Sequence, residues 1–308
     1  MDAKGIKHCN FTEYSSPIFP LDDEVKSLEK NKVTDLAIFL DKIADADLEK
    51  FSEALAKNTS LKSLSFCNTL ISDEGIGYIA SALKINTTLV FLNLANINLG
   101  IAGAQAISEA LEINTTLESL DISTNKIGEH GFGYFTIALT SNKSLKALNL
   151  AGNSIALDGA SEIISGLSKN TTLEELDISN NRISEKNYMT LILDENTSIK
   201  TLNLSDNYLG DIGATTIAQS LAKNTTIETL NLSNNGIDSI GLLAIADGLS
   251  RNTSLKKIYL EGNAIGKIEA EKIKEALENN LSLGSIQIFP EIFVANDAKS
   301  SSSVDDLV

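Results

Sequence analysis

The sequence has no tryptophan and only two cysteines, two histidines and three prolines among its 308 residues. Two cysteines, Cys9 and Cys67, cannot form a disulfide framework, so we expect a reducing compartment. The prolines are confined to the terminal segments, at Pro17, Pro20 and Pro290. The long middle of the chain is therefore free of the residue that most strongly breaks helices and strands.

Basic residues are also scarce, with 25 Lys and Arg against 41 Asp and Glu and a net charge of −16. This balance argues against nucleic acid or an anionic membrane as a partner, because both select a basic surface. It favours a partner with a basic or polar surface. No stretch approaches the roughly 18 apolar residues of a membrane helix, and the opening MDAKGIKHCNF has no apolar signal-peptide core. A cytoplasmic location is expected, including the cytosol of a host cell.

A unit of about 28 residues recurs nine times between Val33 and Ser282. Apolar residues occupy repeat positions 1, 4, 6 and 11, and position 9 is usually Asn. A fixed period of this length predicts a stacked solenoid, because one unit cannot bury its own apolar face. Typical openings are LESLDISTNKI at 117, LKALNLAGNSI at 145 and IETLNLSNNGI at 227.

The first half of each repeat has the alternation of a β-strand. In LKALNLAGNSI, Leu148 and Leu150 are expected to point inward, while Ala147 and Asn149 point outward. A buried Asn at position 9 would take its hydrogen-bond partners from loop N–H and C=O groups, which predicts an asparagine ladder. Its members are Asn125, Asn153, Asn181, Asn207, Asn235 and Asn263.

The second half of each repeat is predicted to be helical. Apolar residues at positions 19 and 23, such as Ile107 with Leu111, share one helix face. Asn at position 26 is expected to end the helix with a positive φ, which asparagine tolerates. This reading explains the many Asn-x-Ser/Thr sequons as turn chemistry instead of glycan sites. The position-26 residues used for it are Asn86, Asn114, Asn170, Asn224 and Asn252.

These motifs resemble the leucine-rich repeats of the ribonuclease-inhibitor class, whose LxxLxLxxN core and helix-bearing unit match residues 33–282. The resemblance implies an α/β fold. It would be a right-handed leucine-rich-repeat solenoid, or horseshoe, with a parallel β-sheet on the concave face and α-helices on the convex face. We expect an N-terminal cap over 1–32, nine repeats over 33–282, a C-terminal cap strand over 283–294 and a disordered acidic, Ser-rich tail over 295–308.

Both ends show signs of capping. Asp22, Val25 and Leu28 predict a short capping helix, since terminal repeats need a cover. Near the other end, LGSIQIFPEIFV predicts one last strand with Ile286 and Ile288 inward. Pro290 should discourage further strand pairing after it.

The sequence offers no catalytic constellation. His8 adjoins Cys9, but a catalytic Cys–His pair must meet in a cleft, which adjacency does not provide. His130 stands alone, without metal-ligand spacing around it, and no phosphate-binding glycine motif is present. We therefore expect a non-enzyme with no cofactor and no metal.

The predicted concave wall is formed by the outward positions 3, 5 and 7, which are mostly small and polar. Its larger and charged residues are the partner-binding candidates, because aromatic and Arg anchors dominate binding hot spots. Position 10 adds two residues at the lip, Arg182 and Tyr208. The full candidate set is Phe91, Asn93, Asp121, Glu175, Asp177, Arg182, Tyr208, Lys257, Tyr259 and Glu261.

Position 2 alternates in charge through six repeats, which predicts a row of ion pairs across neighbouring strands that fixes their register. With this row neutralised, the wall keeps an acidic centre at Asp121, Glu175 and Asp177. The alternating residues are Glu118, Lys146, Glu174, Lys200, Glu228 and Lys256.

The expected function is a non-catalytic, monomeric scaffold that binds a protein through its concave face. The ribonuclease-inhibitor resemblance implies that such a face can cover the active site of an enzyme. The composition also resembles leucine-rich-repeat effectors of intracellular bacteria, so the partner would be an enzyme or another effector. The alternatives are a GTPase-activating protein or a ubiquitin-ligase adaptor of the same repeat class. The motif residues of the first do not map here, where Arg182 and Arg251 are the only arginines.

Overall fold

The protein is described here from a computed structural model, which covers residues 21–39, 42–66, 68–184, 193–280, 285–288 and 291–293. The chain divides into two compact units, Met1–Arg182 and Ile183–Val308. His8, Cys9, Cys67 and the predicted tail over 295–308 lie outside the described residues. The domain boundaries expected from the sequence remain predictions.

The first unit alternates strands and helices after one opening helix. Its strands pair in parallel with their neighbours in chain order, and residues 28 apart face each other, as Leu92 faces Leu120. The elements are α1 Asp22–Glu29, β1 Asp35–Ile38, α2 Asp45–Lys57, β2 Ser63–Phe66, α3 Asp73–Leu83, β3 Phe91–Asn93, α4 Ile101–Ile113, β4 Ser119–Asp121, α5 Gly128–Ser141, β5 Ala147–Asn149, α6 Leu157–Leu167 and β6 Glu175–Asp177.

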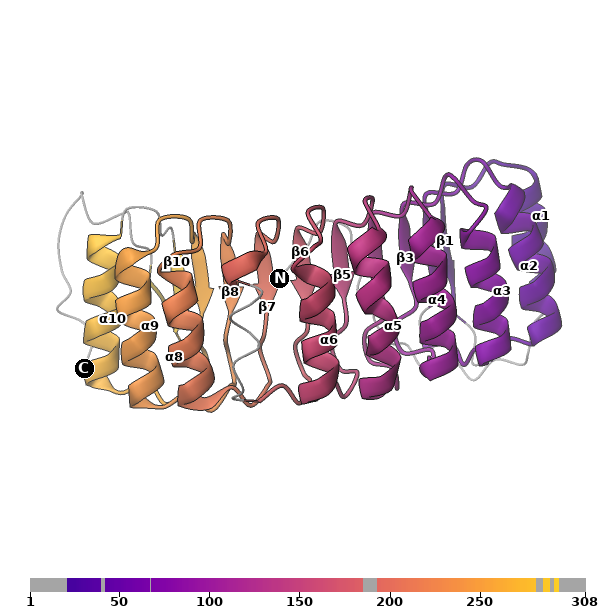
Figure 1. Cartoon of the computed structure of the whole chain (residues 1–308). Helices are drawn as coiled ribbons and strands as arrows, with labels where there is room; N and C mark the ends of the chain where they lie inside the picture. The colour runs from indigo at the N-terminus through magenta and orange to yellow at the C-terminus, as the bar shows by residue number, and fades with distance from the viewer. Residues whose placement is uncertain are drawn as a thin grey trace. The chain divides into compact units, whose positions relative to one another are not determined.

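The second unit repeats the same alternation (Figure 1). Strands β7 to β10 follow one another in the sheet, and the described pairs β7–β8, β8–β9 and β9–β10 are parallel. Strand β11 pairs with β10 in the antiparallel direction. The elements are β7 Thr201–Asn203, α8 Gly210–Leu221, β8 Thr229–Asn231, α9 Ser239–Arg251, β9 Lys257–Tyr259, α10 Lys267–Asn279, β10 Ser285–Ile288 and β11 Glu291–Phe293.

The C-terminal end therefore differs from the expectation of one last strand. The expectation that Pro290 discourages further pairing is wrong, because β11 adds a strand opposite β10, with Ile286 facing Phe293. Pro290 itself falls between the two strands in the sequence and lies outside the described residues. The side chains of Ile286 and Ile288 lie outside the described residues.

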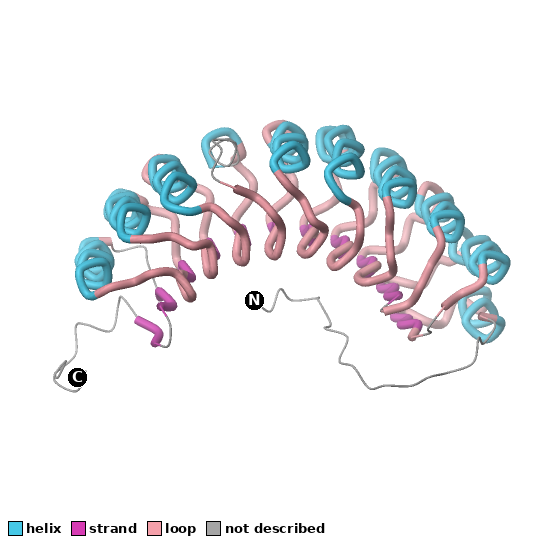
Figure 2. The backbone as a smooth tube through the Cα atoms, turned by 90° about the horizontal axis from the view of Figure 1, so that it is seen from below, coloured by secondary structure: helices cyan, strands magenta, loops and turns pink. Residues whose placement is uncertain are grey.

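In each unit the strands form one layer and the helices the other (Figure 2). The core lies between the layers, where Leu92 and Leu148 of the strands, Leu150 directly after β5 and the helix residues Ile107 and Leu111 are all buried. The alternation predicted for the strands and the apolar face predicted for the helices are both confirmed. The fold is an α/β leucine-rich-repeat solenoid, and α1 covers the first repeat with Leu28 buried.

The predicted ladder at position 9 is present. Asn125 donates from Nδ2 to the carbonyl oxygen of Leu94 over 2.9 Å. Its Oδ1 accepts from the N–H groups of Ile97 and Leu99 at 3.0 and 2.9 Å. The same contacts recur at Asn181 and Asn263, where the buried amide ties its loop to the preceding repeat. Asn153 keeps the donor contact, to the carbonyl oxygen of Ile122 over 2.9 Å, but its Oδ1 accepts no hydrogen bond among the described residues.

A second ladder occurs at position 26, and its geometry corrects the sequence prediction. Asn114 has a φ of −68° and Asn252 a φ of −73°, so neither adopts the positive φ expected of it. The side chain supplies the turn instead: Asn114 donates to the carbonyl oxygen of Leu83 and accepts from the N–H of Leu117, both at 2.8 Å. The buried members are Asn58, Asn86, Asn114, Asn142, Asn170, Asn196, Asn224, Asn252 and Asn280.

None of the described helices is long and apolar enough to cross a membrane.

Candidate protein-binding face

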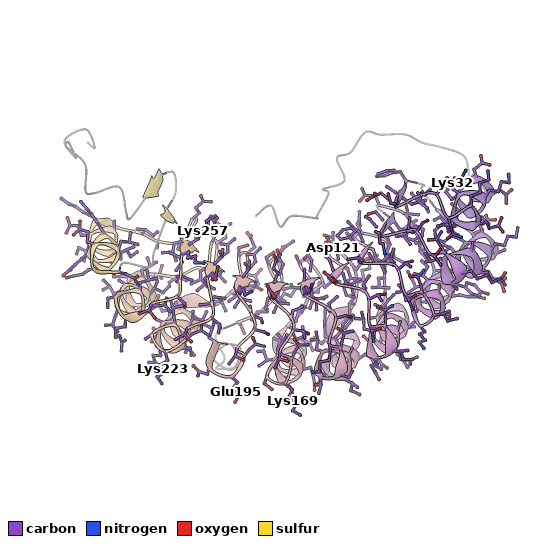
Figure 3. The ribbon with its side chains drawn as sticks, turned by 90° about the horizontal axis from the view of Figure 1, so that it is seen from above. Lys32, Asp121, Lys169, Glu195, Lys223 and Lys257 are labelled. Carbon is purple, nitrogen blue, oxygen red and sulfur yellow. The ribbon has the colours of Figure 1, made fainter. Side chains whose placement is uncertain are left out.

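The strand face is the side of each sheet turned away from the helices, and it carries repeat positions 3, 5 and 7. In Figure 3, Asp121 of the first unit and Lys257 of the second lie on this side, whereas Lys169 and Lys223 lie on the helix side. Because the strands are in register, each position forms a row across the sheet. Phe91, Ser119, Ala147 and Glu175 make up the position-3 row of neighbouring repeats.

The position-3 row is the accessible one. Phe91, Ser119, Ala147 and Glu175 are half-buried, and Lys257 in the second unit is exposed. Small residues fill the centre of the row, so a partner could approach the backbone of β4 and β5 closely. Phe91 and Glu175 stand at either side of this stretch within the first unit.

The position-5 row is held by hydrogen bonds within each strand end. The side-chain Oδ1 of each Asn or Asp accepts from the backbone N–H two residues later, an arrangement that fixes the turn out of the strand. The distances for Asn93, Asp121, Asn149 and Asp177 are 2.8, 2.9, 3.0 and 2.9 Å. Asn203 and Asn231 do the same in the second unit, at 3.1 and 3.0 Å.

This row corrects the prediction of an open acidic wall. Asn93 and Asp121 are only 3% and 4% exposed, so the expectation that both present free polar groups to a partner is wrong. Both side chains are instead engaged by the backbone N–H two residues later. Sequence reasoning missed the role of the row, although Asn or Asp recurs at position 5 in six consecutive repeats.

Burial also changes the electrostatics of Asp121. Desolvation raises the pKa of its carboxyl, the nearby Asp177 carboxylate adds to the rise, and hydrogen bonds from Ser123 and Asn149 oppose it. Both oxygens are occupied: Oδ1 accepts from the Ser123 N–H, and Oδ2 accepts from Asn149 Nδ2 over 3.1 Å. Asp121 is thus a structural group of the sheet.

The acidic centre is reduced to Glu175. Asp177 is half-buried, and its Oδ1 accepts from both the N–H and the hydroxyl of Ser179, at 2.9 and 2.6 Å. Glu175 is half-buried, and its side-chain carboxylate makes no hydrogen bond or ion pair within the described parts of the chain. Of the three acidic residues Asp121, Glu175 and Asp177, Glu175 is therefore the one whose carboxylate remains available to a partner.

The remaining candidates are accessible. Arg182 is exposed in the first unit. In the second unit Tyr208 is 66% exposed, and Tyr259 and Glu261 are half-buried beside the exposed Lys257. Tyr259 pairs in register with Asn231 of β8, so it extends the position-5 row with an aromatic ring.

The predicted row of alternating charges at position 2 is present in both units. Lys146 lies 2.9 Å from Glu118 and Lys256 lies 2.7 Å from Glu228, each pair joining neighbouring repeats. All four side chains are about half accessible to solvent. An ion pair that is exposed to this degree contributes about 0–1 kcal/mol to stability. The row therefore supports the register of the strands.

A further row at position 8 was missed. Asn68, Asn96 and Asn180 have φ values of 54°, 53° and 51°, in the left-handed region that Asn tolerates better than most residues. Asn96 donates to Oδ1 of Asn68 over 2.7 Å, and Asn234 donates to Oδ1 of Asp206 over 2.9 Å. The recurrence of Asn, Asp and Gly at this position was the signal that could have predicted it.

Hollows occur elsewhere on the protein. One of about 390 Å³ lies between α1 and α2 and is lined by residues such as Val25 and Lys50. Another of about 310 Å³ in the second unit is lined by residues such as Asp194 and Lys223. Neither includes a strand-face residue. Within the described residues, no three His, Cys, Asp or Glu side chains are placed to hold a metal ion.

Residues 119–299 match the model of the PRAME C-terminal domain family. No curated protein matches the sequence. Among solved structures, the chain is similar to the actin-binding site 2 of leiomodin-1, with 24% identity and a TM-score of 0.37 over 53% of this chain and 80% of that one. It is also similar to the tropomodulin C-terminal domain of Caenorhabditis elegans, with 12% identity and a TM-score of 0.36 over 52% and 82% of the two chains.

Proposed function

Because this chain belongs to the family of the PRAME C-terminal domain, which its residues 119–299 match, we propose that it is a non-catalytic scaffold that binds a protein partner through its strand face. The leucine-rich-repeat fold leaves one face of each sheet uncovered by helices (Figure 2). A repeated, open surface of this kind suits recognition of another macromolecule, and repeat proteins commonly use it so.

The observation that carries the proposal is the hydrogen-bonded position-5 row. Because the side chains of Asn149 and Asp177 are held by the N–H groups two residues on, they are already ordered before any partner arrives. Ordering side chains at an interface costs free energy, so a surface that is ordered in advance binds more tightly for the same contacts. The row supplies a rigid frame for the position-3 side chains beside it.

The residues of this chain that we assign as anchors for the partner differ between the two units. In the first unit we assign Phe91, Glu175 and Arg182, which offer an aromatic ring and one charge of each sign. In the second unit we assign Tyr208, Lys257, Tyr259 and Glu261, which combine two aromatic rings with a cation and an anion. Aromatic and Arg side chains are the usual sources of binding energy. The net charge of −16 favours a partner with a basic or polar surface.

Occlusion of an enzyme's active site, which the ribonuclease-inhibitor resemblance implies, is the finer form of this proposal. It predicts that the identified partner is an enzyme whose turnover stops when the scaffold is bound. The proposal does not extend to the bacterial-effector resemblance, since the family match is to the PRAME C-terminal domain.

Site-specific photo-crosslinking tests the proposal. A benzoylphenylalanine replaces Tyr259 or Phe91 on the strand face, and Lys223 or Lys169 on the helix side serves as the matched position in the same unit (Figure 3). The strand-face positions should crosslink one dominant protein from cell extract, while the helix-side positions should not. Crosslinks confined to Lys223 and Lys169 would place the partner on the helices and refute the proposal.

Substitution then measures the contribution of the anchors. With the identified partner, Tyr259→Ala and Lys257→Ala should each raise the dissociation constant by about tenfold or more. Lys223→Ala, which is exposed on the helix side, should leave it unchanged. An enzyme assay with saturating scaffold decides whether the partner is also inhibited.

A further inference from the structure

Three exposed isoleucines occupy the same repeat position on three consecutive helices of the second unit. Ile212, Ile240 and Ile268 occupy the first turn of α8, α9 and α10, and they are 56%, 71% and 65% exposed. We call these three residues the isoleucine stripe. The three helices stand side by side in the orange-to-yellow part of Figure 1.

The fold does not require isoleucine at these positions. The core side of α9 is built from Leu242, Ile245 and Leu249, which are fully buried. In the first unit the same repeat position holds small or polar residues, all exposed: Ala46, Glu74, Ala102 and His130. Contiguous exposed apolar groups on a soluble protein mark an interaction surface more often than scattered ones do.

The stripe is widest at its centre. Leu243 lies one turn after Ile240 on α9 and is 37% exposed, whereas the equivalent positions on α8 and α10 hold Thr215 and Glu271. An interface between two identical surfaces related by a two-fold axis has its symmetric contact at the axis. The apolar surface of α9 is therefore suited to meet its own copy.

The charges beside the isoleucine stripe also favour docking of a second copy of this chain. Asp211 precedes Ile212, Ser239 precedes Ile240 and Lys267 precedes Ile268, so the row changes from acidic to basic across the stripe. A two-fold axis along α9 brings α8 of one copy against α10 of the other. Asp211 then faces Lys267 of the second copy on one side of the axis, and the same pair forms on the other side. Such a surface is self-complementary.

Both charges are available for this contact. Lys267 is exposed and has no ion-pair partner within the described residues. Asp211 is half-buried and accepts the N–H groups of Asp238 and Gly241 with Oδ1, at 2.9 and 2.8 Å, which leaves Oδ2 for another donor.

We propose that a second copy of this chain docks on the isoleucine stripe, forming a symmetric dimer with α8 of each copy against α10 of the other. This proposal differs from the monomer expected from the sequence. The surface lies on the helix side, so a dimer of this kind leaves the strand face open for the protein partner.

The oligomeric state of the full chain tests the proposal. Sedimentation velocity over about a hundredfold range of concentration should show a monomer–dimer equilibrium for the wild type. Ile240→Asp buries two uncompensated charges at the axis and should raise the dimer dissociation constant about a hundredfold or more. Ile137→Asp, at a 61% exposed position on α5, is the matched control and should dimerise like the wild type. Thermal unfolding followed by circular dichroism verifies that both variants are folded.

The arrangement of the helices is tested separately with neutral substitutions. Asp211→Asn keeps an acceptor for the two N–H groups but removes the charge, and Lys267→Gln removes the opposite charge. If the two residues face each other, the double variant should weaken the dimer no more than either single variant. Additive losses would exclude α8 facing α10. A wild type that stays monomeric throughout, or equal dimerisation of Ile240→Asp and Ile137→Asp, would overturn the dimer itself.

Discussion

Asn149 donates a hydrogen bond from Nδ2 to Oδ2 of Asp121 over 3.1 Å, and this bond joins β5 to β4 on the strand face. The acceptor is a buried carboxylate whose other oxygen is held by the Ser123 N–H. Burial of this group stabilises its neutral form. The sheet therefore contains one acid whose protonation is coupled to folding.

Asp121→Asn is expected to change how stability depends on pH. Burial raises the pKa of Asp121 above its ordinary value of 3.8, so the folded state binds the proton more tightly than the unfolded state. The stability contributed by this group is fully present below pH 3.8 and is lost as the pH rises through the raised pKa. The asparagine stays neutral, so urea unfolding should show the variant gaining stability relative to the wild type over that window.

The variant should also keep the local hydrogen bond, because Asn203 and Asn231 hold the same place in the second unit. Asp194→Asn removes one exposed carboxylate and controls for the change in net charge. A difference between Asp121→Asn and the wild type that is the same at every pH would contradict the coupling.

Asn114→Ala is expected to destabilise the first unit strongly. Its Nδ2 donates to the carbonyl oxygens of Leu83 and Asn86. Its Oδ1 accepts from the N–H groups of Thr116 and Leu117. Alanine leaves these groups without their partner in the interior, at a cost of about 2–4 kcal/mol. Chemical denaturation measures it. The adjacent Thr115→Ala, at an exposed position, should change stability by less than about 0.5 kcal/mol, and equal effects of the two would contradict the role of the amide.

Gly248→Ala and Gly77→Ala are a matched pair of helix substitutions whose expected effects on stability have opposite signs. A Cβ at Gly248 of α9 would meet the carbonyl oxygen of Ala218 at 2.6 Å, and this neighbour is backbone that cannot rotate away. We expect a loss of about 1–3 kcal/mol, the usual cost of overpacking. A Cβ at Gly77 of α3 meets nothing within 4 Å, so alanine there should stabilise by up to about 1 kcal/mol through helix propensity. Thermal unfolding of both variants distinguishes close helix packing from a general intolerance of substitution.

Lys256→Ala should have little effect on stability. The ion pair with Glu228 is 2.7 Å long, but its side chains are 59% and 41% accessible, so solvent screens it. We expect a loss below about 1 kcal/mol that shrinks further at high salt. Denaturation at low and high ionic strength checks this. A larger loss that salt does not reduce would mean that the lysine stem, not its charge, supports the sheet.

The spacing of the leucines was enough to predict the strands, the helices and their layers. Leu92, Leu120 and Leu148 recur at 28 residues, and each must face its equivalents in neighbouring repeats. The asparagine ladder at position 9 could be predicted for the same reason. A buried amide that recurs at one repeat position in six repeats has only backbone groups of its own loop and the adjacent repeat to bond with.

What could not be predicted depended on contacts that periodicity does not reveal. Asn114 was expected to end its helix through its backbone conformation, whereas the carbonyl groups of the preceding repeat determine its role. Asp121 lies on the strand face as its strand position requires, yet it is buried. The isoleucine stripe is visible in the sequence as three residues 28 apart, but spacing alone does not distinguish an exposed stripe from a core face.

The burial of the position-26 asparagines has a consequence for how the protein can be produced. All nine sit in Asn-x-Ser/Thr sequons and are buried in the folded chain. The amide nitrogen of Asn142, for example, donates to the carbonyl oxygen of Leu111 over 2.7 Å. An oligosaccharide attached to any of them would block native folding at that turn. We therefore expect that, in a secretory host, the folded protein carries no carbohydrate at these nine sites. Molecules that carry it there should be misfolded. Peptide mapping of the folded and misfolded fractions measures the occupancy of each site.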